Sequence, residues 1–314
     1  MKTLFNRIAI LLSITVLTTQ CKKDKNKDQP IAGTKDEWVV LSKDQKDFGD
    51  DAWGFQANNK IYMTAFDPWF HVYDVQQKKW TEEKKAFPTD FMLRYNCLLA
   101  QHNNKVYIAG GQNMGGKLRD FWEFNPANSE WKRLPDLPVP LTGGNIYVYN
   151  NNFYVGMSAT TPHNPQSQRW IYKYSFASNA WENTNIELNS YAGTDGITFQ
   201  KGEDVYYGGG YGYTASDPNP KTFYKYNLRT GAHTRLADMP TTYIENARPN
   251  TFILKEKMYG VVGTRMIVYD PALNSWTHYN NLPEDDEGHG ILYSFQVGNR
   301  VISFTQAGSA FEYL

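Results

Sequence analysis

Short runs of alternating apolar and polar residues recur along this chain, and most end in Gly, Asn or Pro. The clearest series lies between residues 98 and 137. There the runs Leu98–Gln101 and Lys105–Ala109 precede Gly110-Gly111 and a polar loop, and the runs Phe121–Phe124 and around Trp131 follow. Alternation with period two between turn residues is typical of β-strands. The stretch therefore predicts four strands joined by turns.

Three columns of residues recur when the rest of the chain is aligned with this stretch. The first column holds Tyr62, Tyr107, Tyr154, Tyr206, Tyr259 and Ile302, so that successive members are 43 to 53 residues apart. The second holds Tyr73, Phe124, Tyr174, Tyr226, Tyr269 and Tyr313. The third holds Trp80, Trp131, Trp181, His233 and Trp276. Spacing of this size is expected when each repeat contains four strands.

The third column has one member fewer than the other two, and the missing one lies at the start of the chain. Trp38, within Glu37–Leu41, precedes the first full copy. A first strand that pairs with the last three strands would close a ring and leave no exposed sheet edge. The pattern predicts an all-β, six-bladed β-propeller with four antiparallel strands per blade, spanning residues 36–314 and closed by the strand near Trp38.

Composition changes this picture little but excludes several functions. The chain carries 32 basic and 32 acidic residues, so no basic field suggests a nucleic-acid partner. Two cysteines give no disulfide framework, and the six histidines show no spacing typical of a metal site. We expect neither a metal nor a cofactor.

The first twenty residues form a different kind of segment. Lys2 and Arg7 precede an apolar run over residues 8–17, which is the order found in secretory signal peptides. The run is too short to span a bilayer as a stable helix. Residues 1–20 are therefore expected to be removed as a signal peptide.

Cys21 follows this run and resembles the lipidated cysteine of bacterial lipoproteins. Two residues differ from the motif that usually precedes a lipidated cysteine. The leucine, Leu17, lies one position too early, and Gln20 replaces the small residue that usually comes just before the cysteine. The resemblance implies a lipid anchor in the outer membrane of the cell envelope, on its periplasmic or surface face. The alternative is ordinary secretion with a free thiol at Cys21. Residues 21–35 contain little to bury and are expected to be a disordered tether.

Several of the repeated motifs resemble those of the Kelch family. They are Gly110-Gly111 and Gly208–Gly210 after a second strand, Tyr or Phe followed by Asp or Asn at the end of a third strand, and Trp in an outer strand. The double glycine is absent from the first and sixth repeats and reduced to Gly156 and Gly263 in two others. The resemblance implies a Kelch propeller, a group similar to the N-acetylneuraminate epimerases and to galactose oxidase.

Polar residues gather where the six inner strands are expected to begin. Together with flanking aromatic residues, these candidate ligand-binding residues are Asp51, Arg94, Asn96, Arg248, Trp69 and Tyr213. Arginine suits carboxylates and flat rings suit sugar faces. The alternative is a solvated polar rim whose arginines pair with neighbouring carboxylates. If the alignment of the inner strands is wrong by one residue, alternate side chains would instead point away from the channel.

Two functions remain open at this point. The first is a membrane-tethered binding module for a glycan, a peptide or a partner protein. The second is a cofactor-independent sugar mutarotase or epimerase acting on a sialic-acid-like or other acidic sugar, with Asp195, Glu245 and His289 as candidate acids and bases. The sequence gives no ligand identity and no oligomeric state.

Overall fold

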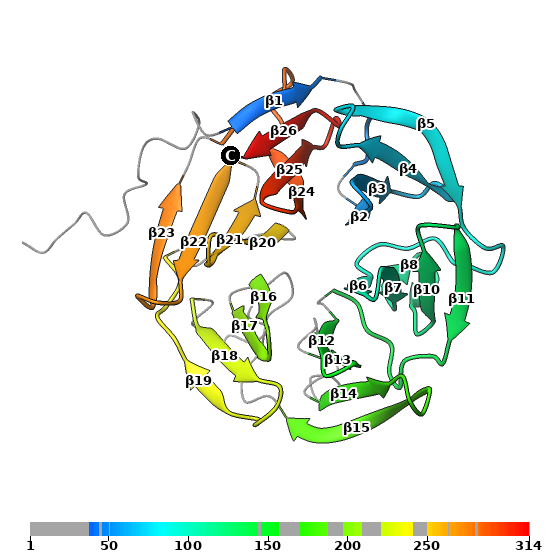
Figure 1. Ribbon diagram of the computed structural model, residues 1–314, viewed down its shortest axis with the longest axis vertical. Helices are drawn as coiled ribbons and strands as arrows, with labels where there is room; N and C mark the ends of the chain where they lie inside the picture. Colours follow the sequence, from blue (N-terminus) through cyan, green and yellow to red (C-terminus); the bar gives the residue numbers. More distant parts are fainter. Residues whose placement is uncertain are drawn as a thin grey trace, which may run out of the picture.

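A computed structural model of the chain shows six β-sheets arranged as blades around one axis (Figure 1). The structure describes residues 38–43, 46–49, 51–143, 146–156, 170–187, 197–208, 221–240, 250–262, 264–279 and 282–313. None of these residues lies in a helix. Within this part of the chain there is accordingly no helix long and apolar enough to cross a membrane.

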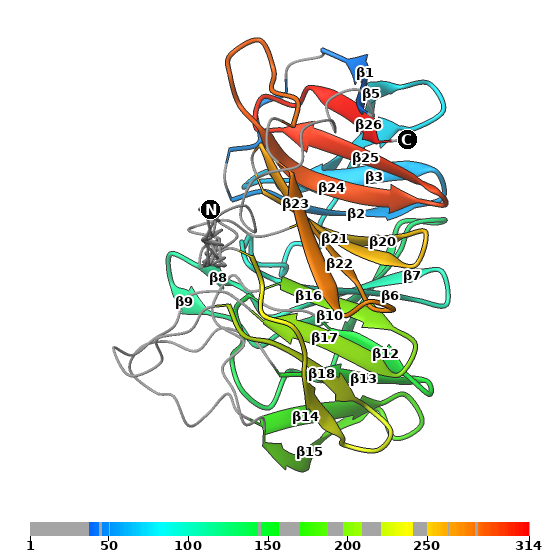
Figure 2. The same cartoon turned by 90° about the vertical axis from the view of Figure 1, so that its left-hand side faces the viewer.

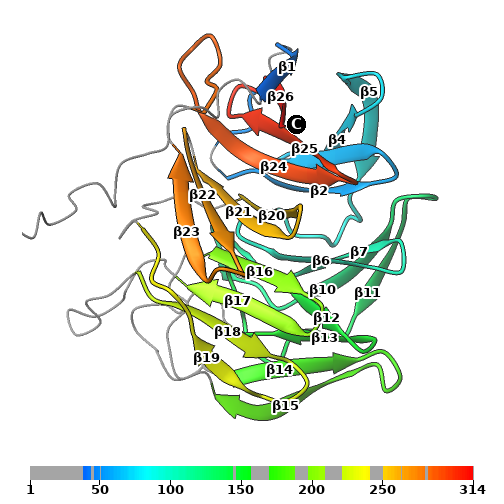
Figure 3. The ribbon, with the colours of Figure 1, turned by 60° about the vertical axis from the view of Figure 1, so that its left-hand side comes forward.

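Each blade is an antiparallel sheet of four strands that run in order from the axis outwards, and Figure 3 shows them obliquely. Blade 1 contains β2 (Trp53–Ala57), β3 (Lys60–Thr64), β4 (Trp69–Asp74) and β5 (Lys79–Ala86). Blade 2 contains β6 (Leu98–His102), β7 (Lys105–Ala109), β10 (Phe121–Asn125) and β11 (Glu130–Leu134). Blade 3 contains β12 (Tyr147–Tyr149), β13 (Asn152–Val155), β14 (Trp170–Ser175) and β15 (Ala180–Glu187).

The second half of the chain repeats this arrangement. Blade 4 contains β16 (Ile197–Lys201), β17 (Asp204–Gly208), β18 (Phe223–Asn227) and β19 (His233–Arg235). Blade 5 contains β20 (Asn250–Leu254), β21 (Lys257–Val262), β22 (Arg265–Asp270) and β23 (Ser275–Tyr279). Blade 6 contains β24 (Ile291–Val297), β25 (Arg300–Thr305), β26 (Ala310–Tyr313) and β1 (Trp38–Ser42).

The two ends of the chain close the ring within blade 6, as the sequence predicts. Strand β1 pairs antiparallel with β26, and Trp38 stands opposite Tyr313. The segment after β1 is bonded to the same blade, since the Lys46 backbone N–H donates to the Ala307 carbonyl at 2.7 Å. The prediction of a six-bladed propeller closed by the first strand is confirmed.

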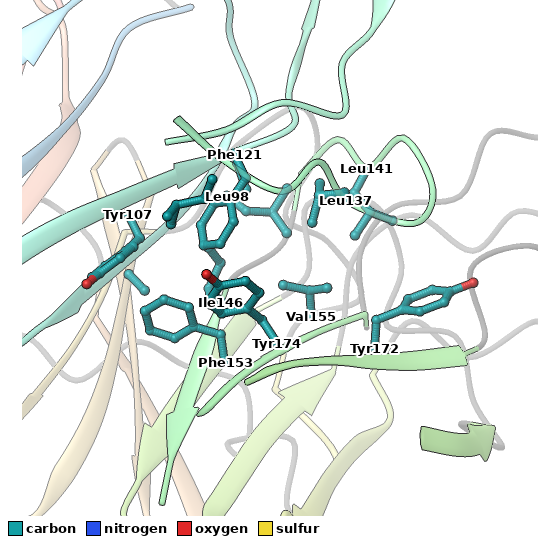
Figure 4. Close-up of a cluster of buried hydrophobic side chains, with 13 residues drawn as sticks. Leu98, Tyr107, Phe121, Leu137, Leu141, Ile146, Phe153, Val155, Tyr172 and Tyr174 are labelled. Atoms are coloured by element: carbon teal, nitrogen blue, oxygen red, sulfur yellow. The ribbon is translucent and has the colours of Figure 1, made fainter. Parts of the chain in front are cut away.

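The core consists of aromatic and aliphatic side chains packed between neighbouring blades. Figure 4 shows the cluster between blades 2 and 3, where Leu98 and Phe121 face Phe153 and Tyr174. The Phe121 and Tyr174 rings meet edge to face with centroids 5.3 Å apart, a favoured geometry. The blades bury both faces in this way, so inner-strand side chains point towards neighbouring blades and not simply into the central channel.

Tryptophans of the third column bond blades 2, 3 and 5 to the blade before each, whereas the Trp38 indole N–H of blade 6 is buried without a partner. The indole N–H of Trp131 donates to the Ala86 carbonyl, that of Trp181 to Pro135, and that of Trp276 to Ala237, at 2.9 to 3.2 Å. Blade 4 differs because His233 replaces the tryptophan and bonds Tyr207 of its own blade. The column is therefore a hydrogen-bonded connection between blades as well as a packing element.

The two ends of the ring are built differently. At one end, Asn58-Asn59, Asn103-Asn104 and Asn150-Asn151 make tight turns in which both residues have positive φ. The opposite end carries the loops between second and third strands and the connections between blades. These loops differ greatly in length, and among the described ones that of blade 2 adds a hairpin, visible at the left of Figure 2. We call this second end the loop end.

Candidate functional site

The hairpin of blade 2 is the most prominent described feature of the loop end. It consists of β8 (Gln112–Asn113) and β9 (Gly116–Lys117) and leaves the blade through Gly110-Gly111. Both glycines have positive φ. A Cβ on Gly111 would lie 2.8 Å from the Tyr95 carbonyl oxygen. Only glycine allows the chain to pass this close to its neighbour.

A buried ion pair lies at the base of the hairpin. Both terminal nitrogens of Arg94 donate to the Asp120 carboxylate, at 2.6 and 2.5 Å. The Trp122 indole donates to the same carboxylate at 2.6 Å. Arg94 also donates to the carbonyls of Gly110 and Met92, at 3.0 and 2.8 Å. One guanidinium thus connects both strands at the base of the hairpin to the linker between blades 1 and 2.

Arg94 is consequently placed differently from the expectation that it binds a ligand at the channel mouth. Its exposed fraction is 0%, and its guanidinium lies over the Phe91 ring at 4.2 Å. The carboxylate and two carbonyls bind four of its five N–H groups, and its burial closes the side chain to a ligand from solvent. Sequence reasoning missed Asp120 as the partner, although a carboxylate just before an aromatic strand was a usable signal.

Two further residues of the expected channel rim lie at the loop end. Asn96 is partly exposed and has a φ of 55°, and its carbonyl accepts a hydrogen bond from Gly143 at 2.7 Å. Asp51 is also partly exposed, two residues before β2. Both are therefore within reach of solvent, in contrast to Arg94.

Trp69 lies farther from the axis because it starts the third strand of its blade. Its ring is partly exposed and the Lys84 ammonium lies 4.2 Å from the ring centroid. Beside it, His71 Nε2 lies 2.6 Å from an Asp67 carboxylate oxygen. Burial lowers the pKa of His71 from its usual value of 6.5, against the opposing effect of Asp67. Sequence reasoning did not single out this pair.

His289 lies in an acidic loop of blade 6. Its side chain is 40% exposed, with Nδ1 3.3 Å from Asp285 and 3.7 Å from Glu287. Burial by itself would raise the pKa of Asp285, but backbone N–H groups of His289 and Glu287 donate to it and the net shift is downward. His289 is thus an exposed imidazole beside carboxylates, which suits proton exchange as well as simple pairing.

The remaining candidate residues lie outside the described part of the chain. They are Asp195, Glu245, Arg248, Tyr213 and Cys21. Among the residues that are described, no group of three or more His, Cys, Asp or Glu side chains could hold a metal ion.

Three exposed apolar residues lie at the loop end of blades 1 and 2. Phe66 between β3 and β4 is 48% exposed, Met92 before β6 is 46% exposed, and Met114 at the tip of the hairpin is fully exposed. The cation Lys117 lies in β9, and Arg119 follows two residues later. Sequence reasoning treated residues 112–119 as an ordinary polar loop. The usable signal was a methionine between Asn113 and Gly115, where a turn residue is expected.

Comparisons with known proteins agree with this architecture. The Kelch motif model matches residues 93–138, which cover all four strands of blade 2 and the end of its preceding linker. Spermatocyte protein spe-26 of Caenorhabditis elegans is 31% identical over 84 residues, which is 27% of this chain and 14% of that protein. Kelch repeat and BTB domain-containing protein 6 of Homo sapiens is 23% identical over 139 residues, which is 42% of this chain and 18% of that protein. The matches thus span less than a fifth of either relative.

A solved structure covers far more of the chain. The structure of YjhT superposes with a TM-score of 0.65 and 14% sequence identity, and the match covers 87% of this chain and 95% of that one. At this identity the likeness concerns the fold. It agrees with a ring of six blades and leaves the chemistry of the loop end to be argued from this chain's own residues.

Proposed function

Because this chain is a six-bladed Kelch-type β-propeller, we propose that it is a membrane-tethered binding module whose loop end holds a glycan, a peptide or a partner protein. The observation that carries the proposal is the contrast between the two ends of the ring. Turns of two residues between first and second strands, and of four or five residues between third and fourth strands, close one end, whereas the other carries loops of uneven length, a hairpin and three of the exposed apolar side chains. Functional residues concentrate on such loops when a rigid scaffold positions them.

The tether is the second part of the proposal. Residues 1–20 act as a signal peptide, Cys21 receives the lipid, and residues 21–35 hold the ring away from the outer membrane of the cell envelope. Two or more acyl chains are enough for stable anchoring. The test is the variant Cys21→Ala, which should move the protein from the membrane fraction to the soluble fraction. Retention of this variant on membranes would show that lipid at Cys21 is not the anchor.

The binding function can be tested on a chain that starts at residue 36, because the closed ring lies within residues 38–313. Immobilised glycan and peptide arrays would be probed with this chain and with a matched set of surface variants. Ligands should be lost when loop-end side chains are changed and kept when the tight turns at the other end are changed. Equal sensitivity at both ends would contradict the proposal.

A sugar mutarotase or epimerase is the second candidate, and one observation favours it. His289 presents an exposed imidazole beside Asp285 and Glu287 at the loop end, and such chemistry needs only an acid and a base near a bound sugar. Anomer exchange of N-acetylneuraminate followed by NMR would decide. Accelerated exchange that is lost in His289→Ala supports an enzyme, and exchange at the uncatalysed rate excludes this activity for that sugar.

A further inference from the structure

We propose that the blade 2 hairpin docks an acidic protein segment that also presents an apolar side chain. We call the five residues that form this surface, Phe66, Met92, Met114, Lys117 and Arg119, the hairpin surface. The inference rests on the proposed binding function of the loop end and names the class of partner. Charge, strand geometry and exposed apolar area support it separately.

The first support is positive charge without compensation. Neither Lys117 nor Arg119 forms an ion pair with a described residue, although the Arg119 Nε–H donates to the Leu137 carbonyl at 2.8 Å. The nearest acid in sequence, Asp120, is already bonded to Arg94. Lys117 is partly buried, and desolvation lowers the pKa of its ammonium. A carboxylate from a partner would restore the interactions that this burial removes.

The second support is the geometry of the hairpin. Tyr95 pairs with Gln112, and Gln112 pairs with Lys117 on the next strand. Residues directly opposite in antiparallel strands share one face, so these three side chains form a row about 10 Å long. An aromatic ring stands at one end of the row, since the Tyr95 and Phe66 rings lie 6.0 Å apart. The row continues with the amide of Gln112 and ends with the ammonium of Lys117.

The outer strand of the hairpin offers a place for an extended chain. Strand β9 pairs with β8 on one side, and no other described strand pairs with its second edge. Extended peptides bind such edges through backbone hydrogen bonds, while alternate side chains supply specificity. An added strand would place its side chains beside Lys117 at regular two-residue intervals.

The third support is exposed apolar surface. Among the described residues six large hydrophobic side chains are exposed, and Phe66, Met92 and Met114 are three of them. They lie on three loops at the same end of blades 1 and 2. Methionine adapts to partners of different shape and is frequent at protein-binding surfaces. The buried Arg94–Asp120 pair holds the base of the hairpin, so less ordering would be needed on binding.

A protein segment fits these observations better than an anionic membrane. Recognition of anionic lipid generally needs clusters of four to eight basic residues, whereas the hairpin surface has two. A strand edge is also of use only to another polypeptide. Binding to vesicles is therefore treated as an alternative outcome of the test.

The experiment is selection from a random peptide phage library on the chain starting at residue 36. We expect the enriched peptides to contain Asp or Glu next to an apolar residue. Synthetic copies are then measured by fluorescence anisotropy against Lys117→Glu and Met114→Ser. The matched controls are Lys255→Glu and Leu273→Ser, exposed positions in tight turns at the other end. The two hairpin variants should bind about tenfold more weakly, Lys117→Arg should bind nearly normally, and the controls should stay within about twofold.

The outcomes separate this inference from the broader proposal. Enriched peptides without acidic residues, or peptides that bind Lys117→Glu and wild type equally, overturn the hairpin surface while a binding function at other loops still stands. No enrichment also overturns the inference, and a failure of the glycan and peptide arrays would in addition remove the binding function. Binding of phosphatidylserine vesicles with unchanged peptide affinity in Lys117→Glu assigns the surface to lipid and refutes the proposal.

Discussion

Removing the carboxylate of Asp120 should destabilise the ring strongly. The substitution Asp120→Ala deletes two hydrogen bonds from Arg94 and one from Trp122. It leaves the Arg94 guanidinium at 0% exposure without a counter-ion. Breaking a buried pair on one side generally costs about 3 to 5 kcal/mol. Since each kcal/mol lowers the melting temperature by about 2 °C in a chain of this size, the expected loss is about 6 to 10 °C.

The double variant Arg94→Met with Asp120→Val distinguishes pairing from general damage. It removes both charges together, so the uncompensated ion disappears; the Gly110 and Met92 carbonyls lose a donor and the Trp122 indole N–H loses its acceptor. We expect it to cost about 1 to 2 kcal/mol, much less than the sum of the single variants. Urea unfolding followed by tryptophan fluorescence measures Asp120→Ala, the double variant and its two single variants, Arg94→Met and Asp120→Val.

The result that would refute this reasoning is additivity of the two single variants, or a loss below about 1 kcal/mol in Asp120→Ala. Either outcome would mean that Arg94 is not held by Asp120 in solution. Arg94 would then become available to a ligand again, as the sequence alone predicts. The same measurements therefore decide between a structural and a ligand-binding role for this arginine.

Two further predictions concern contacts between strands and blades. Trp276→Phe should lower the free energy of unfolding by about 1 kcal/mol, because it removes the indole donor to the Ala237 carbonyl. Trp38→Phe should lower it less, because the Trp38 indole N–H is buried without a partner. Equal losses for the two variants in urea unfolding would contradict a stabilising hydrogen bond between blades. Hydrogen bonds from Arg300 hold the pKa of Glu312 in the folded protein below its usual value of 4.5. The stability that these bonds add is therefore fully present above pH 4.5 and is lost as the pH falls through the lower pKa of the folded state. Melting curves of Glu312→Gln should therefore show a smaller drop below pH 4.5 than wild type, and parallel curves would contradict this.

The sequence is sufficient to predict the ring because each blade repeats the same pattern of strands and of buried aromatic residues. Aromatic residues, mostly tyrosine and tryptophan, fall at fixed places in nearly every repeat, and the missing Trp of the last repeat is found at Trp38. Closure of the ring could therefore be predicted by counting columns. Even the exception is visible, since His233 replaces a tryptophan and, in the structure, bonds within its own blade.

The candidate site could be predicted less well because its contacts are not periodic. Arg94 finds its partner 26 residues away, across a hairpin whose strands have two residues each. Strands this short give no alternation for a sequence pattern to reveal. An unpaired arginine and a buried ion pair look identical in one sequence. The inner-strand alignment also assumed side chains that point into the channel, whereas the blades pack both faces against their neighbours.

The closing segment can be tested with two glycines that share the same backbone conformation. Gly308 and Gly288 both have a φ of +84°, so alanine brings similar backbone strain, about 1 to 2 kcal/mol, at each. Their surroundings differ, because a Cβ on Gly308 would lie 2.6 Å from the Lys46 carbonyl oxygen whereas nothing lies within 4 Å of one on Gly288.

Gly308→Ala should therefore displace the segment that follows β1, which is bonded to this loop through Lys46 and Ala307. We expect an additional loss of about 1 to 3 kcal/mol relative to Gly288→Ala, together with faster proteolysis near Lys46. Trypsin cleavage followed by mass spectrometry measures the second effect. If both variants lose equal stability and show the same cleavage, contact between Lys46 and the Gly308 loop does not contribute to closure, and the β1–β26 pairing alone would have to hold the ring shut.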